Sequence, residues 1–181
     1  MKKQVLVLLA PGFEEIEAVT VVDILRRAGI NVVVAGTIEG PILAARGVTM
    51  LADISVDKIM NDSFDMIVLP GGGEGTEHLG KDARVNQILE QAVKDGKFVA
   101  AICAAPTLLA RFMAGKKATS YPGMSAMMPD VVYTEDRVCV DGRFITSRSP
   151  GTAMEFAFEL ILQLAGEERV RAVNDGVMAR L

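Results

Sequence analysis

Cys103 stands where an apolar, strand-like run meets the start of a helix. The run covers residues 98–102, and Pro106 follows at a position that suits the first turn of a helix, where its missing N–H is not needed. This pattern predicts a tight strand-to-helix turn that presents the Cys103 side chain at the end of a sheet. The positive end of the helix dipole favours the thiolate, so we expect a nucleophile near neutral pH. The alternative is a small buried residue, because free cysteine is among the most buried residue types.

Three carboxylates crowd the first turn of a helix predicted over residues 14–28. They are Glu14, Glu15 and Glu17, and capping of the helix explains acidic residues at this position. Because Ile16 separates Glu15 from Glu17, the three side chains cannot share one direction, and we expect Glu17 to face inward. A buried carboxyl beside a thiolate has a raised pKa. It can donate a hydrogen bond to the sulfur when protonated, or act as a general base when ionised.

A glycine run, Gly71-Gly72-Gly73, follows a buried strand predicted over residues 66–69. Backbone N–H groups without neighbouring side chains can face a ligand and form an oxyanion hole, although a plain turn explains the same residues. The glycine spacing does not fit a dinucleotide-binding fingerprint. Residues 75–82 fit a phosphate-binding loop except at Asp82, which replaces the magnesium-binding Ser or Thr and adds a negative charge. We therefore do not expect nucleotide binding.

His78 is the only histidine of the chain, and Cys139 is the only other cysteine. His78 could serve Cys103 as a base, but we favour a solvated histidine in a loop. One histidine and two distant cysteines make a transition-metal site improbable, and no cofactor is expected. Cys139 is flanked by two valines and followed by Asp-Gly, which indicates a residue in a β-hairpin.

Length and composition predict one domain, residues 1–181, with a core of its own. The net charge of −4 and the lack of a basic block argue against nucleic acid as the main partner. Two cysteines are too few for a disulfide framework and favour a reducing, cytoplasmic location. The apolar start resembles a signal peptide, but it is short and lacks a cleavage site, so a first buried strand explains it better. No apolar run is long enough to span a membrane.

Strand-like and helix-like segments alternate along the chain. Strands are predicted over residues 4–10, 31–35, 49–51, 66–69, 98–102, 131–133, 138–140 and 144–147, and helices over residues 14–28, 83–94, 152–164 and 168–181. The buried face of the first helix is predicted to carry Ile16, Val19, Val22, Leu25 and Ala28. Continuous apolar strands linked by helices predict an α/β domain whose mostly parallel sheet is covered on both faces. A ligand site is expected beyond the carboxyl ends of the strands, where the loop after Ala10, the glycine run and Cys103 meet.

Several ordered motifs together resemble the ThiJ/PfpI superfamily, and within it the branch of the parkinsonism-associated deglycase. They span essentially the whole chain: PGFEEIE at residues 11–17, RRAG at 26–29, LPGG at 69–72, AAICAAP at 100–106 and TSRSPGT at 146–152. The resemblance implies a flavodoxin-like three-layer sandwich, a homodimer and a nucleophile elbow.

The resemblance also implies roles for individual residues. Cys103 would be the reactive cysteine and Glu17 the carboxyl that hydrogen-bonds to it, while Gly72 and Ala104 would supply the backbone N–H donors of an oxyanion hole. Ala104 is a departure, because peptidase-like members usually carry a histidine directly after the cysteine. This departure argues against a Cys-His protease dyad.

Around this centre, the resemblance implies a pocket wall formed by Gly71, Tyr121 and Pro150, and a dimer contact at Arg46. Tyr121 precedes a proline at a place where some deglycase-branch members carry a histidine. A phenol can donate and accept a hydrogen bond but is not a base near neutral pH. Proton transfer would then fall on Glu17.

Three functions follow from these residues, in order of preference. The first is a cysteine-dependent glyoxalase III or protein deglycase that acts on methylglyoxal, glyoxal or early glycation adducts, without glutathione or metal. Its partners would be small dicarbonyls or glycated proteins, and it would protect against oxidative and carbonyl stress. The second is a non-enzymatic oxidative-stress sensor or holdase that works through oxidation of Cys103. The third is a cysteine peptidase or amidase.

Overall fold

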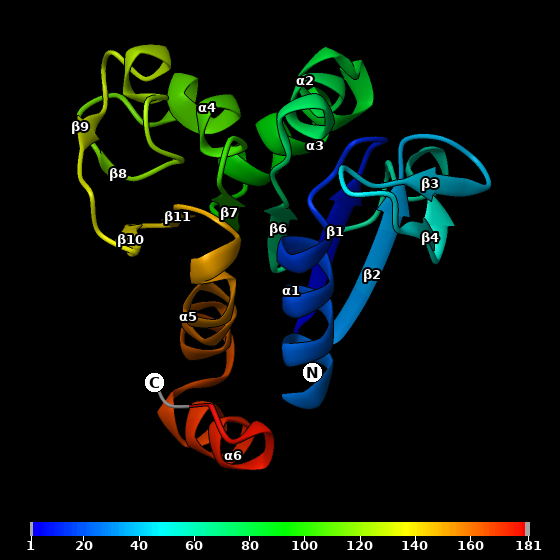
Figure 1. Cartoon of the computed structure of the whole chain (residues 1–181), viewed down its shortest axis with the longest axis vertical. Coiled ribbons are helices and arrows are strands. Elements are labelled where there is room, and N and C mark those ends of the chain that lie inside the picture. The colour runs from blue at the N-terminus through cyan, green and yellow to red at the C-terminus, as the bar shows by residue number, and fades with distance from the viewer. Residues whose placement is uncertain (1, 180–181) are drawn as a thin grey trace.

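A computed structural model describes residues 2–179 of the chain. Its main sheet runs in the order β10-β11-β7-β6-β1-β2-β5, and every neighbouring pair is parallel except β10 with β11 (Figure 1). The strands of this sheet are β1 (Gln4–Leu9), β2 (Asn31–Gly36), β5 (Ile54–Ser55), β6 (Met66–Leu69), β7 (Phe98–Ile102), β10 (Val138–Asp141) and β11 (Phe144–Ser147). The central strands β1, β6 and β7 are almost wholly buried, as strands covered on both faces must be.

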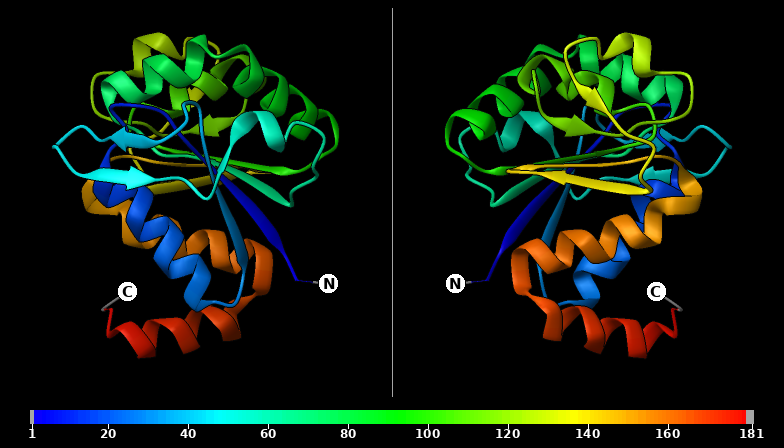
Figure 2. Two further views of the ribbon diagram at one scale, coloured as in Figure 1. Left: turned by 90° about the vertical axis from the view of Figure 1, so that its right-hand side faces the viewer. Right: turned by 90° about the vertical axis from the view of Figure 1, so that its left-hand side faces the viewer.

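Helices cover both faces of the sheet, and the predicted fold class is confirmed. On one face lie α1 (Glu15–Arg27) and α5 (Ala153–Ala165), with α6 (Glu167–Val177) against α5; on the other lie α2 (Gly73–Lys81), α3 (Ala83–Lys94) and α4 (Pro106–Leu109) (Figures 1 and 2). The fold is a flavodoxin-like α/β sandwich. Within residues 2–179, no helix has the length and apolar character that crossing a membrane requires.

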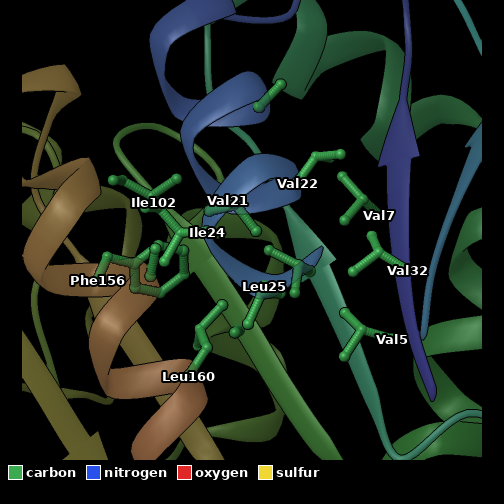
Figure 3. Close-up of a cluster of buried hydrophobic side chains, with 14 of the residues drawn as sticks. Val5, Val7, Val21, Val22, Ile24, Leu25, Val32, Ile102, Phe156 and Leu160 are labelled. Carbon is green, nitrogen blue, oxygen red and sulfur yellow. The ribbon is translucent and has the colours of Figure 1, made fainter. Parts of the chain in front are cut away.

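The core under α1 and α5 is built by alternate residues of β1. Val5 and Val7 point from the sheet toward α1 and α5, where Leu25, Phe156 and Leu160 fill the same cluster (Figure 3). All five side chains are fully buried. Burying each of them stabilises the fold by roughly 1.5–3 kcal/mol. Truncating Leu25 to alanine would cost about 2–5 kcal/mol, because the cavity left behind adds to the lost transfer energy.

The predicted buried face of α1 is partly wrong. Ile16 and Val19 are 55% and 46% exposed, whereas Ala18, Val21 and Leu25 are fully buried. The helix carries two overlapping apolar stripes at helical spacing, and only one of them can meet the sheet. The second stripe leaves Ile16 and Val19 as apolar surface.

Smaller elements surround the main sheet. The predicted strand at residues 49–51 is present, but it forms a separate antiparallel hairpin with a strand that was not predicted. The hairpin consists of β3 (Pro41–Leu43) and β4 (Thr49–Leu51), and a second small sheet is the parallel pair β8 (Lys117–Ala118) and β9 (Val132–Tyr133). The 3-10 turns are η1 (Val56–Lys58), η2 (Ala110–Phe112), η3 (Ser125–Met127) and η4 (Pro150–Thr152). The helix predicted over residues 168–181 is α6, and its last two predicted residues lie outside the described part of the chain.

Helix α2 is the main element that the sequence pattern did not predict. It begins at Gly73 and contains two further glycines, which weaken any helical signal. The fold requires small residues there, because a Cβ at Gly75 would lie 2.7 Å from the Phe13 Cα. Residues 75–82 are therefore helical over most of their length and do not form a phosphate-binding loop.

Candidate active site

The predicted turn at Cys103 is present between β7 and α4. Cys103 has a φ of 67°, in the left-handed region that non-glycine residues seldom adopt. Both sides of its backbone are held: its N–H donates to the Ser147 carbonyl at 3.0 Å, and its carbonyl accepts from the Tyr121 N–H at 2.7 Å. A conformation of this kind costs about 1–3 kcal/mol and persists only where the surroundings impose it.

The three acids at the start of α1 divide into three tasks. Glu14 caps the helix, since its Oε2 accepts from the Glu17 N–H at 2.8 Å. Glu15 accepts from the Arg46 N–H at 2.6 Å and so joins α1 to the turn before β4. Glu17 faces inward, as predicted, and is fully buried.

The Glu17 carboxyl lies between the glycine run and the cysteine. Its Oε2 accepts from the Gly71 N–H at 2.7 Å, and the Cys103 thiol adjoins the carboxyl and lowers its pKa. Its Oε1 is buried and meets no other hydrogen-bond partner among the described residues. The inward carboxyl is therefore available to the sulfur.

Gly71 and Gly72 make this approach possible. A Cβ at Gly71 would lie 2.6 Å from the Cys103 Cβ and 2.7 Å from Glu17 Oε2, so a side chain would separate the two groups. Gly72 has a φ of 91°, and its Cβ would collide with the Gly12 carbonyl oxygen. Only glycine is unstrained at both positions.

Two backbone N–H groups, those of Gly72 and Ala104, adjoin Cys103 and lower the pKa of its thiol. They come from the ends of neighbouring strands, β6 and β7, which bring the glycine run to the cysteine as the parallel sheet predicts. Two convergent N–H groups beside a nucleophile can stabilise an oxyanion that forms next to it.

Burial sets the proton affinities of this pair. It raises the pKa of Glu17 to about 7, against the hydrogen bonds from Gly71 and Cys103, which lower it. Burial also raises the pKa of the Cys103 thiol to about 12, and the adjoining Glu17 charge adds to that shift. Both effects oppose the resting thiolate that the sequence predicts, and that thiolate stays a prediction. The backbone donors lower the pKa, but burial and the like charge outweigh them, and α4 has only four residues to supply a dipole.

The carboxyl and the thiol thus form one coupled acid–base pair. Burial favours the Cys103 thiol, which holds its proton, over the thiolate, and a pKa of about 7 leaves Glu17 partly ionised near neutral pH. A carboxylate with a pKa near neutrality is well suited to remove that proton as the sulfur attacks. The arrangement supports covalent chemistry in which the sulfur loses its proton as it attacks the substrate.

Comparison with known proteins places the chain in a family. A sequence model of the DJ-1/PfpI family matches residues 3–163. The chain belongs to this family. Protein dj-1beta of Drosophila melanogaster is 44% identical over 98% of both chains, and the glutathione-independent glyoxalase DJR-1.2 of Caenorhabditis elegans is 35% identical over 95% of this chain and 94% of its own.

Solved structures extend the likeness to the whole fold. The crystal structure of Drosophila melanogaster DJ-1beta superposes with a TM-score of 0.96 at 43% identity and covers 100% of both chains. Oxidized Toxoplasma gondii DJ-1 superposes with a TM-score of 0.95 at 36% identity, over 99% of this chain and 100% of its own. The resemblance to the ThiJ/PfpI superfamily is confirmed.

The other expected site residues of this DJ-1/PfpI protein lie around the elbow at different distances. Tyr121 is half exposed and is tied to the elbow by its backbone N–H. Pro150 opens η4, in the turn that follows β11. Gly71 is a point of close contact between Cys103 and Glu17 rather than an open wall. Arg46 is exposed and touches α1 through Glu15, away from the sulfur.

His78 was expected in a loop, but it lies on α2. Its Nδ1 hydrogen-bonds to the Pro11 carbonyl at 2.8 Å, and because a carbonyl only accepts, that nitrogen carries the proton. It is therefore not a base for Cys103 through this nitrogen. Among the described residues, no group of three His, Cys, Asp or Glu side chains is placed to hold a metal ion.

Sequence reasoning missed a buried hydroxyl pair beside the elbow, Ser147 and Thr152. Their Oγ and Oγ1 atoms lie 2.6 Å apart. Ser149 and Thr152 have the i, i+3 spacing of a capping motif, and that signal was available in the sequence. The spacing alone does not reveal that the turn adjoins the reactive cysteine.

Proposed function

We propose that this protein is a glutathione-independent glyoxalase in which Cys103 attacks small dicarbonyls such as methylglyoxal and glyoxal. One observation carries the proposal: a buried carboxyl with a pKa near 7 adjoins a cysteine that also receives two backbone N–H donors. A relative that is 35% identical over nearly its whole length carries the name of this activity.

The reaction would begin with activation of the sulfur. The Glu17 carboxylate takes the thiol proton while the sulfur bonds to the aldehyde carbon of methylglyoxal. The carbonyl oxygen becomes an oxyanion that the Gly72 and Ala104 N–H groups stabilise, and the proton on Glu17 then neutralises it. The product of this stage is a hemithioacetal on Cys103, and Glu17 is again a carboxylate.

The second stage is an internal oxidation and reduction. Glu17 removes the proton from the former aldehyde carbon and returns one to the neighbouring ketone carbon, through an enediol. The first carbon is oxidised to a thioester and the second is reduced to an alcohol. Water then hydrolyses the thioester, which releases lactate and restores the thiol. Glyoxal would give glycolate by the same steps. An early glycation adduct would first break down to the free dicarbonyl and the protein's own thiol or amine, and Cys103 would then attack the released dicarbonyl as above.

The experiment is a lactate assay with methylglyoxal as substrate. Wild type should form lactate, and Cys103→Ala should fall to the rate of the buffer. Cys139→Ser is the matched control, because it removes the other buried cysteine and should keep full activity. Lactate formation by Cys103→Ala at the wild-type rate would refute the proposal.

A second candidate function is oxidation sensing, including a holdase role, and the two N–H donors favour it independently. Donors directed at the sulfur would also stabilise the anionic oxygens of a sulfinate. Mass spectrometry after mild peroxide should then show two oxygens on Cys103 before Cys139 reacts. Equal oxidation of the two cysteines would exclude this role. A peptidase function remains the least favoured, since Ala104 follows the cysteine and His78 lies on α2.

We also propose that two copies associate through the surface formed by the outer stripe of α1 and the β3–β4 hairpin. This surface exposes five apolar side chains: Ile16, Val19, Leu43, Val48 and Leu51. Arg46 is exposed beside it, and the buried Glu15 Oε2 has no hydrogen-bond partner among the described residues. Sedimentation should show a dimer for wild type and a shift toward monomer for Arg46→Glu. A monomeric wild type at micromolar concentration would exclude the dimer.

A further inference from the structure

The turn that follows β11 is held by one buried hydroxyl, that of Thr152. Thr152 is 2% exposed, and its Oγ1 lies 2.6 Å from Ser147 Oγ. The same oxygen accepts hydrogen bonds from the backbone N–H groups of Arg148 at 3.2 Å and Ser149 at 3.1 Å. A single side chain therefore joins the beginning of the turn to its end.

The protons of the two hydroxyls have a defined direction. Ser147 Oγ donates to the Arg137 carbonyl at 2.7 Å, which uses its only hydrogen. Ser147 Oγ must therefore accept from Thr152 at 2.6 Å, in preference to the longer 2.9 Å contact that Thr152 makes with the Ser149 carbonyl. The result is a hydroxyl relay, from Thr152 through Ser147 to the Arg137 carbonyl.

This relay lies between the nucleophile and the turn that carries Pro150. The Ser147 carbonyl accepts the N–H of Cys103 at 3.0 Å, so Ser147 contacts the elbow through its backbone and Thr152 through its side chain. Arg137 returns to the same turn, because its Nη2 donates to the Gly151 carbonyl at 2.7 Å. The turn after β11 therefore begins at the residue that holds the Cys103 backbone, and the Thr152 hydroxyl contacts that same residue.

We propose that Thr152 is a positioning residue: its hydroxyl sets how closely the Ser149–Pro150 turn approaches Cys103, and so limits the size of molecule that reaches the sulfur. The role of the turn in substrate selection rests on the proposed function, whereas its effect on thiol access does not. Thr152→Val would leave the half-buried N–H groups of Arg148 and Ser149 without this acceptor and Ser147 without its donor, which favours release of the turn. Thr152→Ser keeps the hydroxyl.

The test compares two thiol reagents of different size. Alkylation of Cys103 by iodoacetamide and by the bulkier N-ethylmaleimide is measured by mass spectrometry of the Cys103 peptide. Thr152→Val should raise the maleimide-to-iodoacetamide rate ratio at least about fivefold, because the loss of even one of the three hydrogen bonds has an effect of that size. Thr152→Ser should restore the wild-type ratio.

Thr119→Val is the matched control. Thr119 is fully buried, and its Oγ1 makes no hydrogen bond with any described residue, so its loss removes a hydroxyl without removing a bond. Its reagent ratio should equal that of wild type. Equal ratios for Thr152→Val and Thr119→Val, or failure of Thr152→Ser to restore the ratio, would overturn the proposal.

Two further measurements keep the result interpretable. If Thr152→Val does not fold, Ser147→Ala breaks the same relay while it keeps the carbonyl that Cys103 contacts, and it should raise the ratio in the same direction. With methylglyoxal, the relay variants should raise KM about fivefold with little change in kcat. If Thr152→Val shifts the reagent ratio but wild type forms no lactate, the proposed function is refuted and the relay stands. If the ratio does not shift but wild type forms lactate, the relay is refuted and the proposed function stands.

Discussion

The two cysteines of this protein are buried to nearly the same extent, yet their surroundings differ in every other respect. Cys103 is 8% exposed and Cys139 is 6% exposed, and burial raises the pKa of both thiols. Cys139 lies in the regular strand β10 opposite Thr146. Cys103 has a left-handed backbone, two N–H donors and the Glu17 carboxyl. Burial alone does not make a cysteine a nucleophile; here the adjoining base and donors make the difference.

The largest effect is expected from a substitution that removes the base and keeps the sulfur. Glu17→Gln should lower the rate of lactate formation about 10²–10⁴-fold, because general base catalysis contributes on that scale. At the other cysteine, Thr134→Val removes a neighbouring hydroxyl that lowers the pKa of Cys139, and it should leave the rate of lactate formation unchanged. Comparable losses in the two variants would show that the Glu17 contact is not what distinguishes the cysteines.

The pH dependence of turnover tests which member of the pair carries the proton. Because burial raises the pKa of Glu17 to about 7, the carboxylate needed as a base forms only as the pH rises through that value. The rate of lactate formation should therefore rise from pH 6 to pH 8. A rate that falls over this range would show that the protonated carboxyl, beside a thiolate, is the working form.

The same carboxyl should weaken the fold as the pH rises. Between the ordinary pKa of 4.5 and the raised value of about 7, the folded protein holds a proton that the unfolded chain has released. Stability is therefore lost as the pH rises through this window, by up to about 3 kcal/mol. Denaturant titrations at pH 5 and pH 8 should show this loss in wild type. Glu17→Gln should reduce it, and an unchanged difference would assign it to other groups.

The smallest expected effect concerns the backbone. At Cys103, glycine should be more stable than alanine by about 1 kcal/mol, because alanine keeps the cost of the positive φ. At Cys139, within a strand, glycine should be less stable than alanine by about 0.5–1 kcal/mol. Thermal unfolding of the four variants measures both differences. The same sign at both positions would mean that the elbow stores no strain.

Local pattern predicted those parts of the fold that local forces determine. The limits of β6, β7 and α3 follow from apolar runs and a helical pattern bounded by Pro, Asp or Gly. Glu17 could be singled out because helix geometry prevents the three acids of the first turn from facing the same way. These inferences needed no knowledge of distant residues.

The remaining features depend on contacts between segments far apart in the chain. Helix α2 was missed because its glycines weaken the helical signal, and only the contact with Phe13 explains why Gly75 is needed there. The buried stripe of α1 was misassigned because two stripes had the same spacing. The direction of the pKa shift at Cys103 depends on burial and on one neighbouring charge, neither of which local sequence reports. The hydroxyl relay likewise exists only once β10, β11 and η4 have come together.

The backbone of Cys103 is held from both sides by residues that come later in the chain, Tyr121 and Ser147. During synthesis, the segment bearing the cysteine leaves the ribosome well before the strand that fixes its elbow. A nascent or truncated chain that lacks β11 therefore cannot assemble the centre, even though Glu17, the glycine run and the cysteine are already present. Cys103 can therefore react as a nucleophile only after the last third of the chain has packed against the rest of the fold. The reactivity of its sulfur thus reports that folding is complete.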